Sequence, residues 1–357
     1  MTTPRTSDVD LVRGLVGIPS VSGDERAAVE FLVARMAERG FRAEIDAAGN
    51  AVGEIGDGPR HVVLLGHIDT VPGDIPVHVE DGHLVGRGAV DAKGPLAAFV
   101  AAATDPVPGL RVTVVGAVEE ESPTSKGARF RATLPAPDWC VVGEPSGWDG
   151  ITVAYKGRLV VSLELERPAR HGAAPGATVA DEALDVWARL RAAAEARGGA
   201  RAFDRLDCRL EGVRAGESDG LVERASLRVG YRVPPGLATA EVAGEIARLA
   251  AEHGGDAVVR VEAGAAEEPV RTSRADPLAR AFARAVVAAG GEPSFKVKSG
   301  TSDMNVLAPA WRCPILAYGP GDSAYDHTPV ERLDLDEYRK AIVVLRGALR
   351  AGAERIP

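Results

Sequence analysis

The sequence predicts an α/β protein in which a mostly parallel sheet, flanked by helices, is interrupted by a second, ferredoxin-like domain. Three observations predict this fold. Short apolar runs alternate with helix-like segments in the first part of the chain, as they do in parallel sheets. The middle of the chain changes to the order β-α-β-β-α-β, which is the ferredoxin-like pattern. Segments of the first kind then return, so we interpret the second domain as an insertion.

Length and composition restrict the class of protein. The chain has 357 residues, of which 45% are hydrophobic and 26% charged, with a net charge of -9. The apolar fraction is too high for a disordered chain, and no apolar run approaches the roughly 18 residues of a membrane span. The polar N-terminus is not a signal peptide, so we expect a cytoplasmic protein. The acidic balance argues against nucleic-acid binding.

The first domain is predicted from helices and buried strands. Residues 8–39 are expected to be largely helical, with a turn at Ile18-Pro19-Ser20 and a second helix start at residues 22–25. An Ala-rich helix is expected at residues 94–103, and another helix at 274–289. Four apolar runs predict buried strands, at 60–65, 110–118, 139–142 and 314–318.

The inserted domain is predicted from alternating strands and two amphipathic helices. Its edges are expected near residues 155–157 and 265–269, which gives a first domain of 1–156 and 267–357 and an insertion of 157–266. Strands are expected at 157–166, 206–213, 221–233 and 257–262, and helices at 178–196 and 239–253.

Histidines and acidic residues follow the predicted strands of the first domain. Ligands of open parallel sheets collect at the carboxyl ends of the strands, so these side chains should meet. They are His67 and Asp69 after the first strand, Glu120 and Glu121 after the second, Glu144 after the third, His327 beyond the fourth, and Asp91 just before the helix at 94–103. Taken singly, each residue is more often structural. It is their joint placement that predicts a site.

This set has the composition of a zinc centre, because imidazole nitrogen and carboxylate oxygen are normal Zn²⁺ ligands. Two histidines with three carboxylates suit two metals that share a bridging acid. Asp69 lies two residues after His67, so its carboxylate could accept the second ring N–H of His67 and fix the tautomer.

The same residues resemble the signature of the M20 family of di-zinc aminoacylases and carboxypeptidases. That family includes acetylornithine deacetylase, succinyl-diaminopimelate desuccinylase and glutamate carboxypeptidase. The resemblance extends over almost the whole chain. It is carried by residues 66–72, 86–94, 120–121, 143–146, 300–303 and 327–331.

The resemblance implies a metal-dependent amide hydrolase with two Zn²⁺ per subunit, which Co²⁺ or Mn²⁺ could replace. It also implies a cis peptide after the bridging acid. The implied metal ligands are His67 and Glu144 for one ion, Glu121 and His327 for the other, and Asp91 as the bridge between them. Glu120 would be the general base and Asp69 would orient His67.

For the inserted domain, the resemblance implies a lid and a dimerisation surface. His171 would reach the active site of the partner subunit in a homodimer and stabilise the oxyanion. Arg232 would bind a substrate carboxylate, although a strand arginine on a solvated face is the alternative. Backbone N–H groups of Gly300, Thr301 and Ser302 would bind an anionic group of the substrate.

Within the family, the chain is most similar to the hydrolases that act on an amino-group carrier protein. His67 and Asp91 are only 24 positions apart, and both the residues between them and the loop at 299–305 resemble those enzymes. They release lysine or ornithine from the C-terminal glutamate of a small acidic carrier, in lysine and arginine biosynthesis. An acidic substrate requires a local basic surface on an acidic enzyme, which we expect at Arg167, Arg170 and Arg232.

Two other functions stay open at this stage. One is a small-molecule N-acyl-amino-acid deacylase of the acetylornithine, acetyl-lysine or succinyl-diaminopimelate type, or a carboxypeptidase. The other is a catalytically silent binding protein, against which the intact ligand set and Glu120 argue. The sequence has no dinucleotide fingerprint after a strand, no P-loop, no G-x-S-x-G elbow and no H-E-x-x-H motif. Cys140, Cys208 and Cys313 form no C-x-x-C pair and are expected to be small buried side chains.

Overall fold

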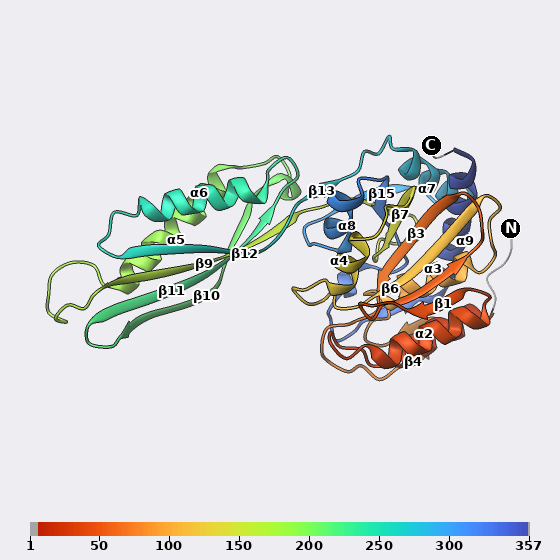
Figure 1. Ribbon diagram of the computed structural model, residues 1–357, viewed down its shortest axis with the longest axis horizontal. Coiled ribbons are helices and arrows are strands. Elements are labelled where there is room, and N and C mark those ends of the chain that lie inside the picture. The colour runs from red at the N-terminus through yellow and green to blue at the C-terminus, as the bar shows by residue number, and fades with distance from the viewer. Residues whose placement is uncertain (1–5, 356–357) are drawn as a thin grey trace. The chain divides into compact units, whose positions relative to one another are not determined.

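The computed structural model describes residues 6–355, which form two compact units (Figure 1). The first unit contains the residues up to Ala154, Thr272–Val297 and the residues from Ser302 onward. The second contains Tyr155–Arg271 and the short segment Lys298–Thr301. The predicted insertion of 157–266 falls inside the second unit. The segment Lys298–Thr301 was not predicted to belong to this unit.

A mixed sheet forms the centre of the first unit. Its strands run in the order β1 (Arg42–Ile45), β2 (Ala51–Ile55), β6 (Leu110–Ala117), β3 (Arg60–His67), β7 (Trp139–Gly143), β15 (Ile315–Ala317) and β8 (Gly150–Tyr155), and β14 (Ser294–Lys298) pairs with β8. The four central strands, β6, β3, β7 and β15, are parallel. The strands on both sides of them are antiparallel. The predicted mostly parallel sheet is therefore correct for the centre, where the carboxyl ends of the strands share one edge.

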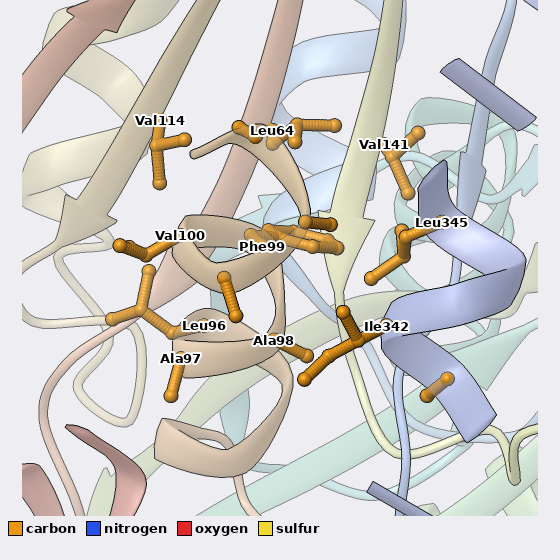
Figure 2. Close-up of a cluster of buried hydrophobic side chains, with 14 of the residues drawn as sticks. Leu64, Leu96, Ala97, Ala98, Phe99, Val100, Val114, Val141, Ile342 and Leu345 are labelled. Atoms are coloured by element: carbon orange, nitrogen blue, oxygen red, sulfur yellow. The ribbon is translucent and has the colours of Figure 1, made fainter. Parts of the chain in front are cut away.

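Helix α3 (Lys93–Ala103) is the most deeply buried helix, with every residue inaccessible to solvent. It packs against β3, β6 and β7 on one side and against α1 (Thr6–Val16) and α9 (Leu335–Arg355) on the other. Figure 2 shows Phe99 and Leu96 of α3 surrounded by Leu64, Val141 and Leu345. The remaining helices of the unit are α2 (Arg26–Glu38), α4 (Lys126–Ala132), α7 (Pro277–Ala288) and α8 (Asp303–Trp311).

Two glycines allow α3 to approach the sheet next to the candidate site. Gly66 and Gly143 are cross-strand partners in β3 and β7. A Cβ atom on Gly143 would lie 2.9 Å from the ring of Phe99 and 3.0 Å from the Cα of Gly66. Such contacts are shorter than packed atoms tolerate, so a side chain at Gly143 would push α3 away. The close approach brings Asp91, just before α3, toward His67, which follows Gly66.

The second unit has the predicted order of six elements. These are β9 (Gly157–Pro168), α5 (Val179–Ala196), β10 (Asp207–Ser218), β11 (Val222–Val233), α6 (Thr239–Ala251) and β12 (Val258–Glu267). The strands form an antiparallel sheet in the order β10-β11-β9-β12, as in ferredoxin-like folds. Alternate residues of β9, from Leu159 to Leu165, are buried against α5 and α6 (Figure 1). A capping box at Thr178 and Asp181 begins α5.

Several elements were not predicted from the sequence. The edge strand β1 is largely exposed, and its neighbour β2 is a short strand of five residues that contains a glycine and a glutamate, so neither gives a clear apolar run. Helix α9 was missed although Tyr338, Ile342, Leu345 and Leu349 are buried at helical spacing, a signal that periodicity carries. The short elements are a small sheet of β16 (Arg332–Asp334), β5 (His83–Val85) and β4 (His78–Glu80), strand β13 (Val270–Arg271), and 3-10 turns at Ala202–Asp204 and Ser323–Tyr325.

The three cysteines are buried or half-buried, as small apolar side chains usually are. Cys140 is buried within β7, and Cys208 and Cys313 are half-buried. Burial raises the pKa of Cys208 and of Cys313 to about 11, and that of Cys140 well above its usual value. These thiols therefore carry little thiolate near neutral pH, which makes them poor nucleophiles. No helix among the described residues is long and apolar enough to cross a membrane.

Replacing Phe99 with alanine tests the packing of α3. We expect the free energy of unfolding to fall by about 3–5 kcal/mol, because the change leaves a cavity between α3 and the sheet. Chemical denaturation measures the loss. The control is Val287→Ala on α7, whose side chain is 60% exposed and whose loss should change stability by no more than about 0.5 kcal/mol. Equal effects of the two substitutions would contradict the packing described here.

Candidate metal centre

The predicted ligands of the first unit meet at the carboxyl edge of the central parallel strands. His67 is the last residue of β3, Glu120 and Glu121 lie in the loop after β6, and Glu144 follows β7. Asp91 directly precedes Ala92, the N-cap of α3. His327 lies beyond β15, after the 3-10 turn at Ser323–Tyr325. Five separate segments of the chain thus contribute to one cluster.

Asp91 lies at the centre of this cluster. Its Oδ1 is 3.2 Å from Nε2 of His67, and its Oδ2 is 3.0 Å from Nε2 of His327. Nε2 of His327 also lies 2.8 Å from Oε1 of Glu121. Each carboxylate oxygen of Asp91 therefore faces a different imidazole, which is the arrangement a bridging ligand needs. The peptide bond between Asp91 and Ala92 is cis, as the family resemblance implied.

Two groups of ligand atoms are close enough to hold a metal ion each. One is His67, Glu120 and Glu121, and the other is Asp91, Glu121 and His327, with the ligand atoms of each group within 4.8 Å of one another. Glu144 belongs to neither group, although it is buried and its charge acts on Glu120. The geometry thus places Glu120, rather than Glu144, beside His67 and Glu121. The ligand role of Glu144 stays a prediction.

The electrostatics of the cluster favour added positive charge. Burial alone would lower the pKa of His67, but hydrogen bonds to Asp69 and Asp91 and the charge of Glu120 raise it well above its usual value. Hydrogen bonds to Asp91 and Glu121 raise the pKa of His327 to about 10. Burial, together with the charges of Asp303, Glu144 and Glu121, raises the pKa of Glu120.

Carboxylates outnumber imidazoles in this cluster, and their charges repel one another in a poorly solvated space. A divalent cation offsets that repulsion, and nitrogen and oxygen atoms are ligands suited to zinc. The residues present therefore fit a metal centre.

Asp69 has a wider role than the orientation of His67. Nδ1 of His67 is 3.0 Å from the backbone oxygen of Asp69 and 3.5 Å from its Oδ1, so the closer acceptor is the carbonyl rather than the predicted carboxylate. The carboxylate instead accepts the N–H groups of Glu120 and Glu121, both at 3.0 Å, and the hydroxyl of Ser22 at 2.7 Å. Asp69 is fully buried. It fixes the loop that carries two of the candidate ligands.

Asp303 belongs to the segment 300–303 that resembles the family, but no role was predicted for it from the sequence. It is the first residue of α8, is 99% buried, and neither carboxylate oxygen has a hydrogen-bond partner among the described residues. Burial raises its pKa to about 8, and the charges of His67, Asp69 and Glu144 act on it. Asp303 therefore adds one more acidic group beside the cluster. An isolated Asp at a helix start gives no signal of this in the sequence.

Among the residues predicted to bind substrate, Arg232 and Thr301 lie together in the second unit. Nη1 of Arg232 lies 3.4 Å from the hydroxyl of Thr301. Burial and the charges of Arg158 and Arg209 lower the pKa of Arg232, while the charges of Glu211 and Glu267 act in the opposite direction. Three guanidinium groups and two carboxylates therefore gather there. His171 lies in an exposed loop of the same unit, where its Nδ1 accepts the N–H of Ala173.

Ser302 does not fit the predicted role of an N–H donor to substrate. Its N–H donates to Oδ1 of Asn305, and its hydroxyl accepts the N–H of Met304, which together cap α8. A backbone donor that is already engaged in a capping box cannot also serve an anionic ligand without breaking the cap. Gly300 and Thr301 remain as the predicted backbone donors.

Two arginines that we expected to form a basic surface are neutralised. Arg167 is buried and donates to Glu182 and Glu223, both at 2.8 Å. Arg170 pairs with Asp256. Their charges are balanced within the unit, so the expectation was wrong for both. Arg158 and Arg209, which flank Arg232, have no ion-pair partner among the residues that the structure describes.

Comparison with known proteins identifies the class. The chain matches the model of peptidase family M20/M25/M40 over residues 63–351 and belongs to this family, which is metal-dependent. Its fold is that of a tripeptidase from Staphylococcus aureus, with a TM-score of 0.80, 19% identity, and coverage of 97% of this chain and 98% of that one.

Two relatives are similar in sequence as well. The chain is 47% identical to a [LysW]-lysine hydrolase of Deinococcus radiodurans over 350 residues, which cover 95% of each chain. It is 30% identical to a [LysW]-lysine/[LysW]-ornithine hydrolase of Saccharolobus islandicus, over 92% of this chain and 91% of the relative.

Metal addition and removal test the centre directly. We expect Zn²⁺ to raise the melting temperature of protein that was first treated with a chelator, because a bound cation stabilises the folded state by mass action and offsets the carboxylate repulsion. Differential scanning calorimetry with and without Zn²⁺ measures the shift. Mg²⁺ at the same concentration is the control, since it prefers oxygen ligands in octahedral geometry and should shift the melting temperature less. Equal melting temperatures with and without Zn²⁺ would count against a metal centre.

Proposed function

We propose that this protein hydrolyses the amide bond that joins lysine or ornithine to an amino-group carrier protein, as a step of lysine or arginine biosynthesis. The observation that carries the proposal is the 47% identity, over 95% of both chains, with a [LysW]-lysine hydrolase. The cluster around Asp91 supports the hydrolytic chemistry. We place the reaction in the cytoplasm, where free amino acids are made.

The proposed cofactor is a pair of Zn²⁺ ions, for which His67 would serve one, Glu121 and His327 would serve the other, and Asp91 would serve both. When bound, the ions would polarise the scissile carbonyl and make a water molecule more acidic. Glu121 lies in both groups of close ligand atoms, and we assign it to the ion on the His327 side. Glu144, buried at the end of β7, is proposed as a further ligand on the His67 side.

Glu120 is the proposed general base. Its raised pKa suits a carboxylate that takes a proton from the attacking water and later returns it to the leaving amine. Its backbone is held by Asp69, which limits how far the carboxylate can move. The amine that leaves would be the amino group of lysine or ornithine, and the acid product would stay on the carrier.

The second unit supplies the proposed substrate contacts. The guanidinium of Arg232 would bind a substrate carboxylate bidentately, with Thr301 and Gly300 offering further donors. Arg158 and Arg209 beside Arg232 make this region attractive to an acidic carrier. His171 would act from a partner subunit in a homodimer formed through the second unit. Its exposed loop position is compatible with that role.

Substrate comparison tests the proposed function. Zinc-loaded protein is incubated separately with carrier-lysine, carrier-ornithine, N-acetylornithine and N-succinyl-diaminopimelate, and release of the free amine is followed. We expect kcat/KM for a carrier-linked substrate to exceed that for either small substrate by at least about 10-fold, because the carrier adds contacts that a small acyl group lacks. The control is Glu120→Gln, which should lower the turnover of every substrate and so show that the measured release comes from this site. Faster turnover of either small substrate would favour a small-molecule deacylase instead.

Three substitutions separate the proposed roles. Asp91→Ala should lose bound zinc and activity together, because a bridging ligand would serve both ions. Glu120→Gln should lower kcat by about 10²–10⁴-fold while keeping zinc, as expected for a general base. His171→Ala should likewise lower turnover with zinc retained. Zinc content by atomic absorption, read beside kcat, distinguishes them. Loss of zinc in His171→Ala would make this histidine a ligand and contradict its assignment.

A further inference from the structure

Glu331 is a buried carboxylate to which the proposed mechanism gives no role. It lies at the end of the segment 326–331, four residues after His327, and is completely inaccessible to solvent. Its Oε1 accepts the N–H of Val90 at 2.9 Å and that of Asp91 at 3.0 Å. Its Oε2 accepts from Nη1 of Arg87 at 2.9 Å. Both oxygens are therefore engaged with the segment that carries Asp91.

Arg87 extends the same network. Its Nη1 also donates to the backbone oxygen of Thr328 at 3.2 Å, and its Nε donates to the backbone oxygen of Gly73 at 3.1 Å. The N–H of Gly86 donates to the backbone oxygen of Glu331 at 3.2 Å. Arg87 and Glu331 therefore connect the segment that contains Asp91 to the segment that follows His327. Arg87 also connects both segments to the loop at Gly73.

The segment that carries His327 needs such support. His327 has a φ of 60°, in the left-handed region that side chains other than glycine rarely adopt. Such a conformation costs of order 1–3 kcal/mol and persists only where the surroundings hold it. The hydrogen bonds at Thr328 and Glu331 hold the segment that follows His327 close to Asp91.

We propose that Glu331 is a positioning residue that sets the separation of Asp91 and His327, and so determines how tightly the Asp91–Glu121–His327 group holds its metal ion. The inference rests on the proposed metal centre. Glu331 acts through the backbone N–H of Asp91 and through the loop of His327, and it touches neither ion. The His67–Glu120–Glu121 group is held instead by Asp69, which forms a separate set of hydrogen bonds.

This separation makes the expected effect selective. Removal of Glu331 frees Asp91 and His327 but leaves the contacts of Asp69 intact. Loss of residues that orient metal ligands typically weakens metal affinity by about 10–100-fold. We therefore expect the affinity for the ion of the Asp91–Glu121–His327 group to fall by that factor, because two of its three members lose support. The other ion should be weakened less, because it shares only Asp91 with the displaced segments.

The experiment compares Glu331→Ala and Glu331→Gln with the native full-length chain. Zinc stoichiometry after dialysis and stepwise affinity against a competing chelator are measured for each. The alanine variant should keep one ion and lose the other. The glutamine variant should be partly rescued, because its amide oxygen can still accept the N–H groups of Val90 and Asp91 while the charge opposite Arg87 is lost. If the alanine variant does not fold, the glutamine variant and Arg87→Met carry the test.

The matched control is Glu182→Gln in the second unit. Glu182 is also buried, and it accepts from Arg167 and from the N–H of Ala257, both at 2.8 Å. Its substitution removes a comparable buried ion pair and should leave both zinc affinities unchanged.

Three results would overturn the inference. The first is native affinity for both ions in Glu331→Ala, and the second is equal weakening of both ions there. The third is selective loss of one ion in the control. Zinc binding by the native protein is measured first. If the native protein binds no zinc, the proposed metal centre itself is refuted, and this outcome is distinct from failure of the inference about Glu331.

Discussion

The candidate site depends on one physical constraint, which is the gathering of like-charged carboxylates in a space with little water. Asp91, Glu120, Glu121 and Asp303 lie near two imidazoles at the edge of the sheet. Such a cluster is unfavourable by itself, as the raised pKa values of Glu120 and Asp303 indicate. The fold must therefore provide the rigidity that keeps the candidate ligands together. A bound cation would offset the repulsion between their charges, which the fold alone does not remove.

Rigidity comes from a set of buried polar side chains that are not themselves ligands. Asp69 accepts three hydrogen bonds and thereby fixes the loop of Glu120 and Glu121. Glu331 accepts three more and fixes the segments of Asp91 and His327. The close contact of α3 with Gly66 and Gly143 sets the distance between these segments and the sheet. The candidate metal ligands, which come from five separate segments, are thus positioned by a small number of satisfied, buried carboxylates.

The second unit distributes its charges in a different way. Most of its arginines are balanced by nearby carboxylates, as the buried pair of Arg167 and Glu182 illustrates. The group around Arg232 differs, because Arg158 and Arg209 form no ion pair among the described residues, although the charges of Glu211 and Glu267 act on Arg232 in the opposite direction. A protein with a net charge of -9 can attract an acidic partner only through such a local concentration of positive charge. This is the physical reason to look for carrier recognition around Arg232 rather than over the whole surface.

The sequence by itself determined the class of fold, the order of the six elements in the insertion, and the ends of the central strands where His67, Glu121 and His327 lie. Those features depend on local periodicity, which can be read from the sequence, and on the rule that parallel strands share a carboxyl edge. Only the tertiary structure decided that Asp69 fixes a neighbouring loop, that Ser302 caps a helix, and that Arg167 is neutralised. It also brought Glu331 to Asp91 across about 240 residues. Each of these depends on which buried partner a polar group finds, and that is decided by packing between distant segments rather than by the pattern around the residue.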